Sequence, residues 1–490
     1  MTPPFVILHA ASELFPYSKT GGLADVTAAL PQALCGVALP LEVHVATPRY
    51  RTCPLPSDAR RVDPRTCTEA DPAAATASPW WRAQDASGVT TWWWEDPAWF
   101  DRDGIYVDAQ GVPFADNEER FIAFSEAVLE LAEARGVHLL HGHDWQTAWA
   151  CYRSRLIAPR RPVVFTVHNL AFQGRMSFGR AHAAGVFRDG TDVADLEFHG
   201  EVNVMKGALR RADVVTTVSH SYAHEIRSPA FGEGLDGVLR HDVRWLAGIT
   251  NGLDDGWNPA SDAAIAAPFE RQALAGRRRC QEALAAELGW PQDDTRTLTV
   301  GVVSRLTYQK GIDVALPALE IALHRRRIRL VVLGRGEVGI EQQLATLRAQ
   351  HPDRCALFLT YDEALAHRIY AGVDLLLMPS RFEPCGLAQL IAMRYGAVPL
   401  VHRTGGLRDT VVDVDASEEG WGLATEQNNP GALYERLERA LALFERPELW
   451  HLLRDRALRR DHSWGSAAAA YAEIYRTLLT DRNYGQQEAT

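Results

Sequence analysis

The chain has 490 residues, of which 47% are hydrophobic and 23% are charged, and its formal net charge is −11 at pH 7. This length is sufficient for two or three domains with full-sized cores, and the composition is ordinary for a globular protein in water. The acidic balance, without any long run of Lys or Arg, argues against nucleic acid or an anionic membrane as a partner. No apolar run approaches the length that spans a membrane, and no secretory signal precedes the first apolar segment.

The seven cysteines are scattered along the chain and form no C-x-x-C pair. An odd number of widely spaced cysteines argues against a disulfide framework. We therefore expect a reduced, cytoplasmic protein without a structural zinc site.

The apolar residues 5–10 predict a buried strand, and a helical pattern follows from the paired glycines Gly21 and Gly22 to about residue 34. Glycines before a helix allow a ligand to approach the backbone closely, and Lys19 places a cation beside them. A tight turn with a solvated lysine explains the same spacing equally well. The spacing alone does not decide between the two.

Two further strands, at about 137–141 and 162–167, end in polar loops that carry Asp144 and His168. In a parallel sheet we expect these side chains to converge on one crevice. His141, His143 and His168 are potential metal ligands, but no carboxylate accompanies them at a metal-binding spacing, so we expect no metal. The tryptophans at 92–94 and Trp99 could stack on sugar rings, although packing in a strand and core is favoured.

After a Gly- and Pro-rich stretch at 248–259, the alternation of strand and helix starts again. Apolar strands are predicted at 298–304, 328–333, 356–359, 373–378 and 398–402, each followed by a helix or a polar loop. The fold class is α/β. We predict two doubly wound domains in tandem, with a ligand crevice between them.

The strand at 373–378 leads into a loop that carries Glu383 and then into Gly386, where a helix begins. Free N–H groups at such a helix start suit a phosphate group. Glu383 would then lie beside the anion rather than on it. This combination points to transfer chemistry on a donor that carries a phosphate.

A rival interpretation comes from Gly334, Gly336 and Gly339, which match the dinucleotide fingerprint G-x-G-x-x-G of NAD-dependent dehydrogenases. That fingerprint belongs after the first strand of its domain, and here the strand at 298–304 comes earlier. Arg335 and Glu341 also crowd the expected pyrophosphate position. The dehydrogenase is therefore disfavoured.

Eight motifs in order carry a resemblance to a known family. They are Lys-Thr-Gly-Gly-Leu-Ala-Asp at 19–25, His-Asp-Trp at 143–145, Phe-Thr-Val-His-Asn-Leu-Ala-Phe-Gln-Gly at 165–174, Asn-Gly-Leu-Asp at 251–254, Ser-Arg-Leu-Thr-Tyr-Gln-Lys-Gly at 304–311, Tyr-Asp-Glu-Ala-Leu-Ala-His-Arg at 361–368, Pro-Ser-Arg-Phe-Glu-Pro-Cys-Gly-Leu at 379–387 and Arg-Thr-Gly-Gly-Leu at 403–407. From about residue 5 to about residue 476 the chain resembles bacterial glycogen synthases, which are close kin of plant starch synthases.

The resemblance implies a GT-B fold and a retaining glucosyltransferase that moves glucose from ADP-glucose to the non-reducing end of an α-1,4-glucan, without a metal or other cofactor. It implies domains at 1–246 and 247–463, with a C-terminal helix at about 464–480 that packs back on the first. Transfer also requires exclusion of water, so we expect the domains to close on the donor about a hinge near 246–258.

The resemblance also implies roles for individual residues. Arg305 and Lys310 would neutralise the diphosphate, and His168 and Glu383 would complete the catalytic set, with Glu383 acting electrostatically rather than as a nucleophile. Tyr361 would stack on adenine or, equally, belong to the core or a helix cap. The remaining expected substrate-binding residues are Lys19, Gly21, Gly22, Asp25, Tyr106, Asp144, Asn251, Cys385, Gly386, Leu387, Thr404 and Gly405.

Two alternatives stay open from the sequence. Many GT-B transferases carry a second glutamate for the ribose, and here that position is Ile391, as in glycogen synthases. The donor could be UDP-glucose rather than ADP-glucose, or the chain could be a non-catalytic relative that binds glucan or nucleotide. The joint presence of Lys19, His168, Arg305, Lys310 and Glu383 favours catalysis.

Overall fold

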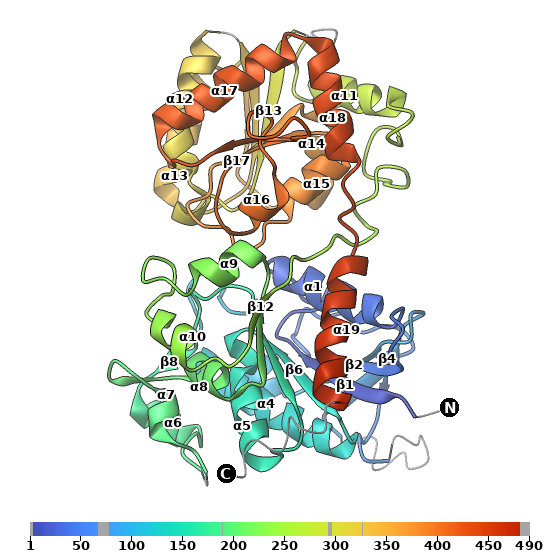
Figure 1. Cartoon of the computed structure of the whole chain (residues 1–490), viewed down its shortest axis with the longest axis vertical. Helices are drawn as coiled ribbons and strands as arrows, with labels where there is room; N and C mark the ends of the chain where they lie inside the picture. The colour runs from blue at the N-terminus through green and yellow to red at the C-terminus, as the bar shows by residue number, and fades with distance from the viewer. Residues whose placement is uncertain (1–2, 67–77, 189, 293–295, 326, 481–490) are drawn as a thin grey trace. The chain divides into compact units, whose positions relative to one another are not determined.

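The computed structural model describes residues 3–66, 78–188, 190–292, 296–325 and 327–480 (Figure 1). Contacts divide the chain into two compact units. Unit 1 consists of residues 1–252 together with 464–490, and unit 2 consists of residues 253–463. Among the described residues, no helix is both long enough and apolar enough to cross a membrane.

Unit 1 is built on a nine-stranded sheet in the order β12-β11-β7-β6-β1-β2-β5-β4-β3. The strands from β12 to β5 pair in parallel, and β4 and β3 add an antiparallel edge. The strands are β1 Phe5–Ala10, β2 Leu41–Pro48, β3 Arg60–Arg61, β4 Trp80–Gln84, β5 Thr90–Trp94, β6 Leu139–His143, β7 Val163–Val167, β11 Val214–Thr217 and β12 Leu246–Gly248. A small second sheet contains β8 Arg175–Met176, β9 Glu197–Phe198 and β10 Glu201–Asn203. The strand order reverses between β1 and β6, which is where ligand sites form in such sheets.

Helices accompany this sheet, and one of them comes from the far end of the chain. They are α1 Gly22–Leu34, α3 Pro97–Phe100, α4 Asn117–Ala134, α5 Trp145–Ile157, α6 Phe178–Ala183, α7 Val193–Leu196, α8 Val204–Arg211, α9 His220–Glu225, α10 Asp236–His241 and α19 Gly465–Thr480. Helix α19 lies beside α1 (Figure 1). Tyr471, Ile474 and Tyr475 of α19 are buried in the same apolar cluster as Val26 and Leu30 of α1. The C-terminal helix is therefore part of the core of unit 1.

The tryptophans of β5 settle one alternative raised by the sequence. Trp92 and Trp93 are 0% and 1% exposed, and the indole N–H of Trp92 donates to Nδ1 of His44 at 2.9 Å. A buried ring cannot stack on a sugar from solvent. The interpretation of these residues as strand and core residues is confirmed.

Unit 2 contains one six-stranded sheet, and all its neighbouring strands are parallel. Its order is β15-β14-β13-β16-β17-β18, so the strand order reverses between β13 and β16. The strands are β13 Leu298–Val303, β14 Ile328–Leu333, β15 Cys355–Phe358, β16 Leu375–Met378, β17 Val398–His402 and β18 Leu423–Thr425. The helices are α11 Ala275–Glu287, the 3-10 turn η1 Tyr308–Lys310, α12 Ile312–His324, α13 Val338–Gln350, α14 Glu363–Gly372, α15 Ala388–Arg394, α16 Gly405–Thr410, α17 Pro430–Phe444 and α18 Pro447–Leu458.

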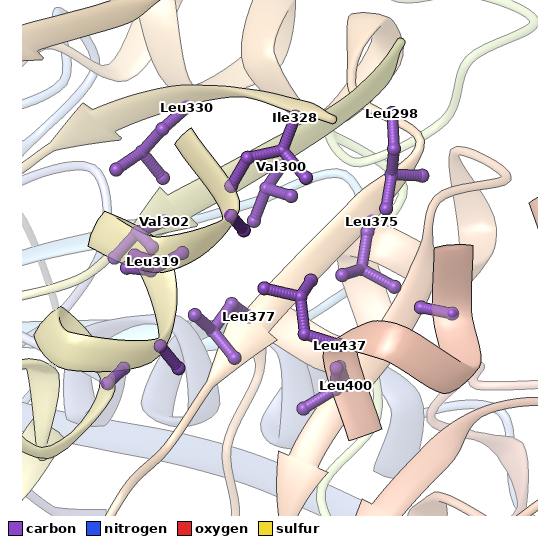
Figure 2. Close-up of a cluster of buried hydrophobic side chains, with 14 of the residues drawn as sticks. Leu298, Val300, Val302, Leu319, Ile328, Leu330, Leu375, Leu377, Leu400 and Leu437 are labelled. Atoms are coloured by element: carbon purple, nitrogen blue, oxygen red, sulfur yellow. The ribbon is translucent and has the colours of Figure 1, made fainter. Parts of the chain in front are cut away.

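Both faces of this sheet are apolar because helices cover both of them. Leu298, Val300 and Val302 alternate along β13 and pack with Leu319 of α12 and Leu437 of α17 (Figure 2). On the opposite face, strand residues that include Val331 and Leu376 pack against α11, α14 and α15. The prediction of two doubly wound α/β domains is confirmed.

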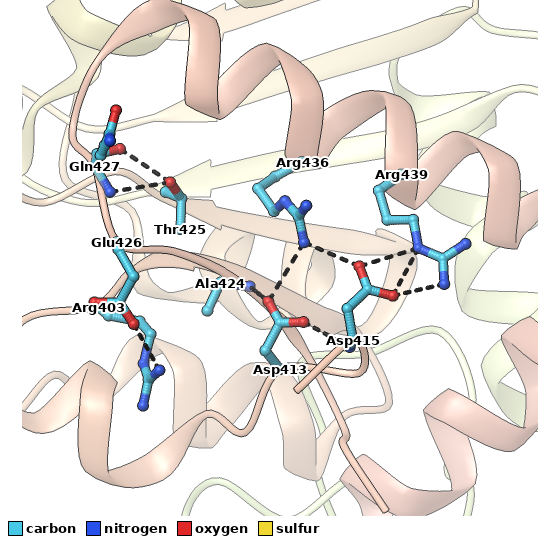
Figure 3. Close-up of polar contacts among 9 residues, drawn as sticks. All are labelled: Arg403, Asp413, Asp415, Ala424, Thr425, Glu426, Gln427, Arg436 and Arg439. Atoms are coloured by element: carbon cyan, nitrogen blue, oxygen red, sulfur yellow. Dashed lines mark hydrogen bonds and ion pairs between the residues drawn. The ribbon is translucent and has the colours of Figure 1, made fainter. Parts of the chain in front are cut away.

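A polar network fixes the edge of this sheet near the end of β18 (Figure 3). Asp413 accepts from the backbone N–H of Ala424 at 2.6 Å, and Asp415 forms ion pairs with Arg436 at 3.0 Å and Arg439 at 2.6 Å on α17. These contacts tie β18 to α17. The loop after β17 is held against the same edge by an ion pair of 2.7 Å between Arg403 and Glu426.

The glycines that match a dinucleotide fingerprint have a packing role instead. A Cβ atom on Gly334 would lie 1.8 Å from the carbonyl oxygen of Ser304, and one on Gly336 would lie 2.1 Å from that of Leu306. The N–H of Gly336 donates to the carboxylate of Glu341 at 2.8 Å rather than standing open for a pyrophosphate. Gly334 and Gly336 therefore let this loop lie against the loop after β13.

This geometry makes a paired prediction. Gly336→Ala should destabilise unit 2 by about 1–3 kcal/mol, because the added methyl group meets backbone that cannot move aside. Gly339→Ala is the matched control, since its Cβ would have no neighbour within 4 Å and the position lies in α13. There the change should be neutral or stabilising by up to about 1 kcal/mol. Calorimetric unfolding of the two variants measures both effects, and equal shifts in the two would contradict the packing role.

Candidate active site

Two loops meet at the reversal point of the sheet in unit 2. The first follows β13 and the second follows β16, so both leave the carboxyl ends of neighbouring parallel strands. The backbone N–H of Arg381 donates to the carbonyl oxygen of Gln309 at 2.8 Å. Gly311, at φ 65°, lies so close to Pro379 that a Cβ atom would be 2.1 Å from its carbonyl oxygen. The two loops are therefore held as one surface.

On this surface the structure brings Lys310 and Glu383 into contact. Nζ of Lys310 lies 2.6 Å from Oε2 of Glu383, and the hydroxyl of Ser380 donates to the same oxygen at 3.0 Å. The whole of Glu383 is only 6% exposed. Its other oxygen, Oε1, has no hydrogen-bond partner among the described residues. The sequence placed Lys310 against a phosphate and did not predict this ion pair.

Arg305 lies on the same loop but is exposed. Within the described part of the chain, its guanidinium makes one hydrogen bond, of 3.3 Å, to Oε1 of Gln309. The structure thus separates the two cations that the sequence treated alike. Lys310 is held beside a carboxylate, whereas Arg305 projects from the loop.

The segment around Gly386 begins helix α15 slightly later than expected. Gly386 has a left-handed φ of 72°, Leu387 is the N-cap, and the helix starts at Ala388 rather than at Gly386. Cys385 is buried, and its carbonyl oxygen accepts from the side chain of Gln389 at 3.1 Å. A left-handed residue is required here to turn the chain from the loop into the helix.

The loop after β17 packs directly against Glu383. The N–H of Gly406 donates to the carbonyl oxygen of Glu383 at 3.0 Å, and a Cβ atom on Gly405 would lie 2.0 Å from that same oxygen. Thr404 is buried and precedes helix α16. The expected residues Thr404 and Gly405 thus lie next to the backbone of Glu383, where a side chain on Gly405 would displace it.

Tyr361 lies in neither of the structural positions that the sequence left open. Its side chain belongs to a residue that is 75% exposed, so it is not in the core. Helix α14 is capped by the next residue, Asp362, whose carboxylate accepts from the N–H of Leu365 at 2.8 Å. The interpretation of Tyr361 as a core or capping residue is therefore wrong.

In unit 1 the loop between β1 and α1 is organised by Glu13, a residue that sequence reasoning missed. Glu13 is 3% exposed and accepts from the backbone N–H groups of Thr20 at 2.6 Å and Gly21 at 3.1 Å. It also accepts from the hydroxyl of Tyr106 at 2.8 Å. We expected a ligand to approach the backbone at Gly21, but the N–H of Gly21 donates to Glu13 instead. The hydroxyl of Tyr106 likewise supports the loop.

Lys19 is not a simply solvated lysine. Its Nζ lies 2.8 Å from Oδ1 of Asp25, in the first turn of α1, which begins at Gly22. The ammonium group also lies 5.0 Å from the ring centre of Phe15. The structure therefore joins two of the expected residues, Lys19 and Asp25, into one charged pair at the start of α1.

Asp144 and His168 converge at the carboxyl ends of β6 and β7, as expected. Oδ1 of Asp144 accepts from the backbone N–H of His168 at 2.7 Å, and Asp144 has a left-handed φ of 56°. Burial raises the pKa of Asp144 to about 7 and lowers the pKa of His168 to about 3. The imidazole of His168 is therefore neutral at pH 7.

Asn251, close to the end of the first segment of unit 1, carries an unsatisfied polar atom. The residue is 7% exposed, and its Oδ1 is buried without a hydrogen-bond partner among the described residues. Such an atom costs about 1–3 kcal/mol when nothing bonds to it. Such an acceptor is available to a bound ligand or an ordered water.

Comparison with known proteins identifies the family of this chain. Residues 6–241 match the family described as Starch synthase catalytic domain, and residues 297–442 match Glycosyl transferases group 1. Glycogen synthase of Granulibacter bethesdensis is 41% identical over 97% of this chain and 100% of its own length. Glycogen synthase of an Anaeromyxobacter species is 40% identical over 96% of this chain and 99% of its own length.

Solved structures agree with this assignment. The catalytic domain of starch synthase IV from Arabidopsis thaliana, described as bound to ADP and acarbose, has a TM-score of 0.84 and 32% identity. It covers 98% of this chain, and this chain covers 100% of it. A sucrose-phosphate synthase from Thermosynechococcus elongatus shares the fold at a TM-score of 0.60 and 18% identity. The fold is GT-B, and the chain belongs to the glycogen synthase family of glycosyltransferases, which transfer glucose in glycogen synthesis.

Proposed function

We propose that this glycosyltransferase uses ADP-glucose as its donor and extends the non-reducing end of an α-1,4-glucan with retention of configuration. The observation that carries the proposal is the contact between Lys310 and Glu383 on paired loops at the reversal point of the sheet in unit 2. The ADP and acarbose bound to the Arabidopsis starch synthase IV domain support an adenine nucleotide and a sugar chain as the ligand classes. We also propose a cytoplasmic location.

Lys310 suits two tasks at once. An ammonium group has three donors, and the 2.6 Å contact with Glu383 uses one of them. The others can bond the oxygens of a diphosphate. The planar guanidinium of exposed Arg305 offers paired donors for the same group. As the bond to the leaving diphosphate breaks, these fixed cations stabilise its growing negative charge.

Glu383 then acts on the other half of the transition state. The sugar gains positive charge at C1 while the diphosphate leaves, and a buried carboxylate nearby stabilises that charge. Oε2 is occupied by Lys310 and Ser380, and Oε1 can accept from a glucose hydroxyl. Two hydrogen bonds hold the carboxylate before any substrate arrives. Its orientation therefore costs little during the reaction.

In unit 1 we assign Lys19, Asp144, His168 and Asn251 to recognition of the donor. A sugar presents hydroxyl groups that both donate and accept, so it requires partners of both kinds. The unpaired Oδ1 of Asn251 is an acceptor. The ring of His168 is neutral, because its pKa is about 3; its Nε2 contacts Nδ1 of His143 at 3.0 Å, which leaves Nδ1 for a sugar hydroxyl.

The remaining assignments are narrower. We propose that Tyr361 stacks on the adenine ring, since a side chain that is 75% exposed is accessible to a ligand. Gly386, Leu387, Cys385, Thr404 and Gly405 would shape the backbone beside the diphosphate. Gly21, Gly22 and Asp25 would set the loop that carries Lys19.

A transfer assay tests the donor. Incorporation of labelled glucose into glycogen should be faster from ADP-glucose than from UDP-glucose, and it should be undiminished after treatment with a chelator. Faster transfer from UDP-glucose would overturn the choice of donor. Loss of turnover with the chelator, restored by a divalent metal, would overturn a mechanism in which Arg305 and Lys310 alone neutralise the diphosphate. No transfer from either donor would favour the non-catalytic alternative.

Substitution of Glu383 tests its role. Glu383→Gln should lower kcat by at least about a hundredfold, because one preorganised electrostatic group is worth about 2.7–4 kcal/mol in the transition state. ADP affinity should stay the same or rise, since Lys310 is released from its ion pair. Turnover and ADP binding are measured on the same preparations.

Asp415→Asn is the control for the loss of an ion pair as such, because Asp415 pairs with Arg436 and Arg439 at the edge of the sheet (Figure 3). It should leave turnover unchanged. Near-normal turnover in Glu383→Gln would exclude the electrostatic role. So would a covalent glucosyl adduct on Glu383 in the parent enzyme, which mass spectrometry would detect.

A further inference from the structure

A continuous line of buried side chains leads away from His168 into the core of unit 1. Nε2 of His168 lies 3.0 Å from Nδ1 of His143, and Nε2 of His143 lies 3.1 Å from Nδ1 of His9. Nε2 of His9 is in turn 3.4 Å from the hydroxyl of Tyr475. His9, His143 and Tyr475 are 0% exposed. One end of this line is a proposed substrate-binding residue, and the other end lies on the C-terminal helix.

The line continues beyond Tyr475. The Tyr475 hydroxyl lies 2.6 Å from Nδ1 of His141, and Nε2 of His141 lies 2.6 Å from the hydroxyl of Thr166. Thr166 then shares a hydrogen bond of 2.5 Å with the hydroxyl of Thr216. We call the set His168, His143, His9, Tyr475, His141, Thr166 and Thr216 the histidine line.

The parallel register of the sheet explains why these residues meet. His9 on β1 pairs with His141 on β6, His143 on β6 pairs with Thr166 on β7, and Thr166 pairs with Thr216 on β11. His141 and His143 are two residues apart, so their side chains leave the same face of β6. Helix α19 covers that face and contributes Tyr475.

All four imidazoles are neutral. Burial lowers the pKa of His9 to about 3 and that of His168 to about 3, and it lowers the pKa values of His141 and His143 well below 6.5. A neutral imidazole carries one N–H donor and one bare nitrogen acceptor. Each ring in the line therefore donates one hydrogen bond and accepts the other, so the direction of one hydrogen bond fixes the direction of the next.

The Tyr475 hydroxyl decides that direction. It has a single proton, and the short 2.6 Å contact with His141 is the better place for it than the 3.4 Å contact with His9. A phenol O–H is also a stronger hydrogen-bond donor than a neutral imidazole N–H. Its oxygen then accepts from Nε2–H of His9. It follows that Nε2–H of His143 donates to Nδ1 of His9, and that Nε2–H of His168 donates to Nδ1 of His143.

We propose that His9, His143 and Tyr475 are positioning residues that hold His168 in its Nε2–H tautomer, so that its Nδ1 remains an acceptor for a substrate hydroxyl. The proposal rests on the proposed role of His168 in donor recognition. Among the described residues, Nδ1 of His168 has no hydrogen-bond partner. The helix that closes the chain thereby acts on the reaction without touching the substrate.

A metal site is the competing interpretation of part of the same cluster. His9, His141 and His143 each have a ring nitrogen that lies within 4.8 Å of a ring nitrogen of the other two. The ring of His143 is stacked on those of His9 and His141, however, with ring centres 5.4 Å apart at 17° and 4.3 Å apart at 27°. A metal requires lone pairs in the ring planes that point at one centre. Both nitrogens of His141 are also engaged by Tyr475 and Thr166.

The first test is Tyr475→Phe, which removes only the hydroxyl. In the full-length protein labelled with 15N-histidine, the parent should show His168 as the Nε2–H tautomer by NMR, with the signals assigned through single histidine variants. In Tyr475→Phe, His168 should populate both tautomers. The value of kcat should fall on the order of tenfold, which corresponds to the loss of about one hydrogen bond, while KM changes less than about twofold.

Tyr471→Phe is the matched control. Tyr471 lies on the same helix, is equally buried, and its hydroxyl is 3.4 Å from Thr216 at the far end of the line. Its loss should leave the His168 tautomer and kcat unchanged. The proposal is overturned if the parent shows Nδ1–H at His168, or if Tyr475→Phe and Tyr471→Phe behave alike.

The metal interpretation and the underlying function are tested separately. Titration of the chelator-treated protein with Co²⁺ should show no stoichiometric binding. Stoichiometric binding that is lost in His9→Asn would overturn the proposal in favour of a metal site. The protein could show the expected His168 tautomers in the parent and in Tyr475→Phe and yet have no transferase activity. That outcome would contradict the proposed function and support the histidine line.

Discussion

The reversal of strand order in each sheet is the constraint on which the polar sites depend. In unit 2, β13 and β16 are neighbours in parallel register, so the loops that follow them leave the sheet side by side. In unit 1 the same holds for β1 and β6. Adjacent parallel strands end at one edge, and loops from distant parts of the sequence are thereby brought together. Lys310 and Glu383 are 73 residues apart and meet at 2.6 Å for this reason.

Burying a carboxylate costs desolvation free energy, and each buried acid in these sites accepts hydrogen bonds from fixed donors. Glu383 has Lys310 and Ser380, Glu13 has the N–H groups of its own loop, and Asp144 has the N–H of His168. A buried ion pair is rarely kept for stability alone, because desolvation offsets most of the attraction. A preorganised charge is instead what a transferase requires when charge develops at C1 and on the leaving group. The histidines are preorganised in a similar way. Their low pKa values keep them neutral, so they differ only in which ring nitrogen carries the proton.

Local patterns in the sequence determined the elements and most of the motifs. The predicted strands at 5–10, 328–333 and 398–402 have the bounds found in the structure, since apolar periodicity depends only on near neighbours. The α/β class and the family followed from the same information. The fingerprint at Gly334 was weighed correctly as weak, and its packing cause is visible only in the contacts with Ser304 and Leu306.

Tertiary structure decided which polar groups face one another, because pairing depends on strand order and register rather than on local spacing. His9 and Tyr475 are 466 residues apart, and no pattern along the chain relates them. The hydrogen bond from the Gly21 N–H to Glu13 and the ion pair between Lys310 and Glu383 were likewise not predictable from the sequence, which suggested a ligand at Gly21 and a diphosphate at Lys310. A motif specifies that a cation or a free N–H is present in a loop. The fold decides which acceptor lies nearest to that group. Because a buried acid without a partner costs free energy, it pairs with a donor that the sheet brings within reach.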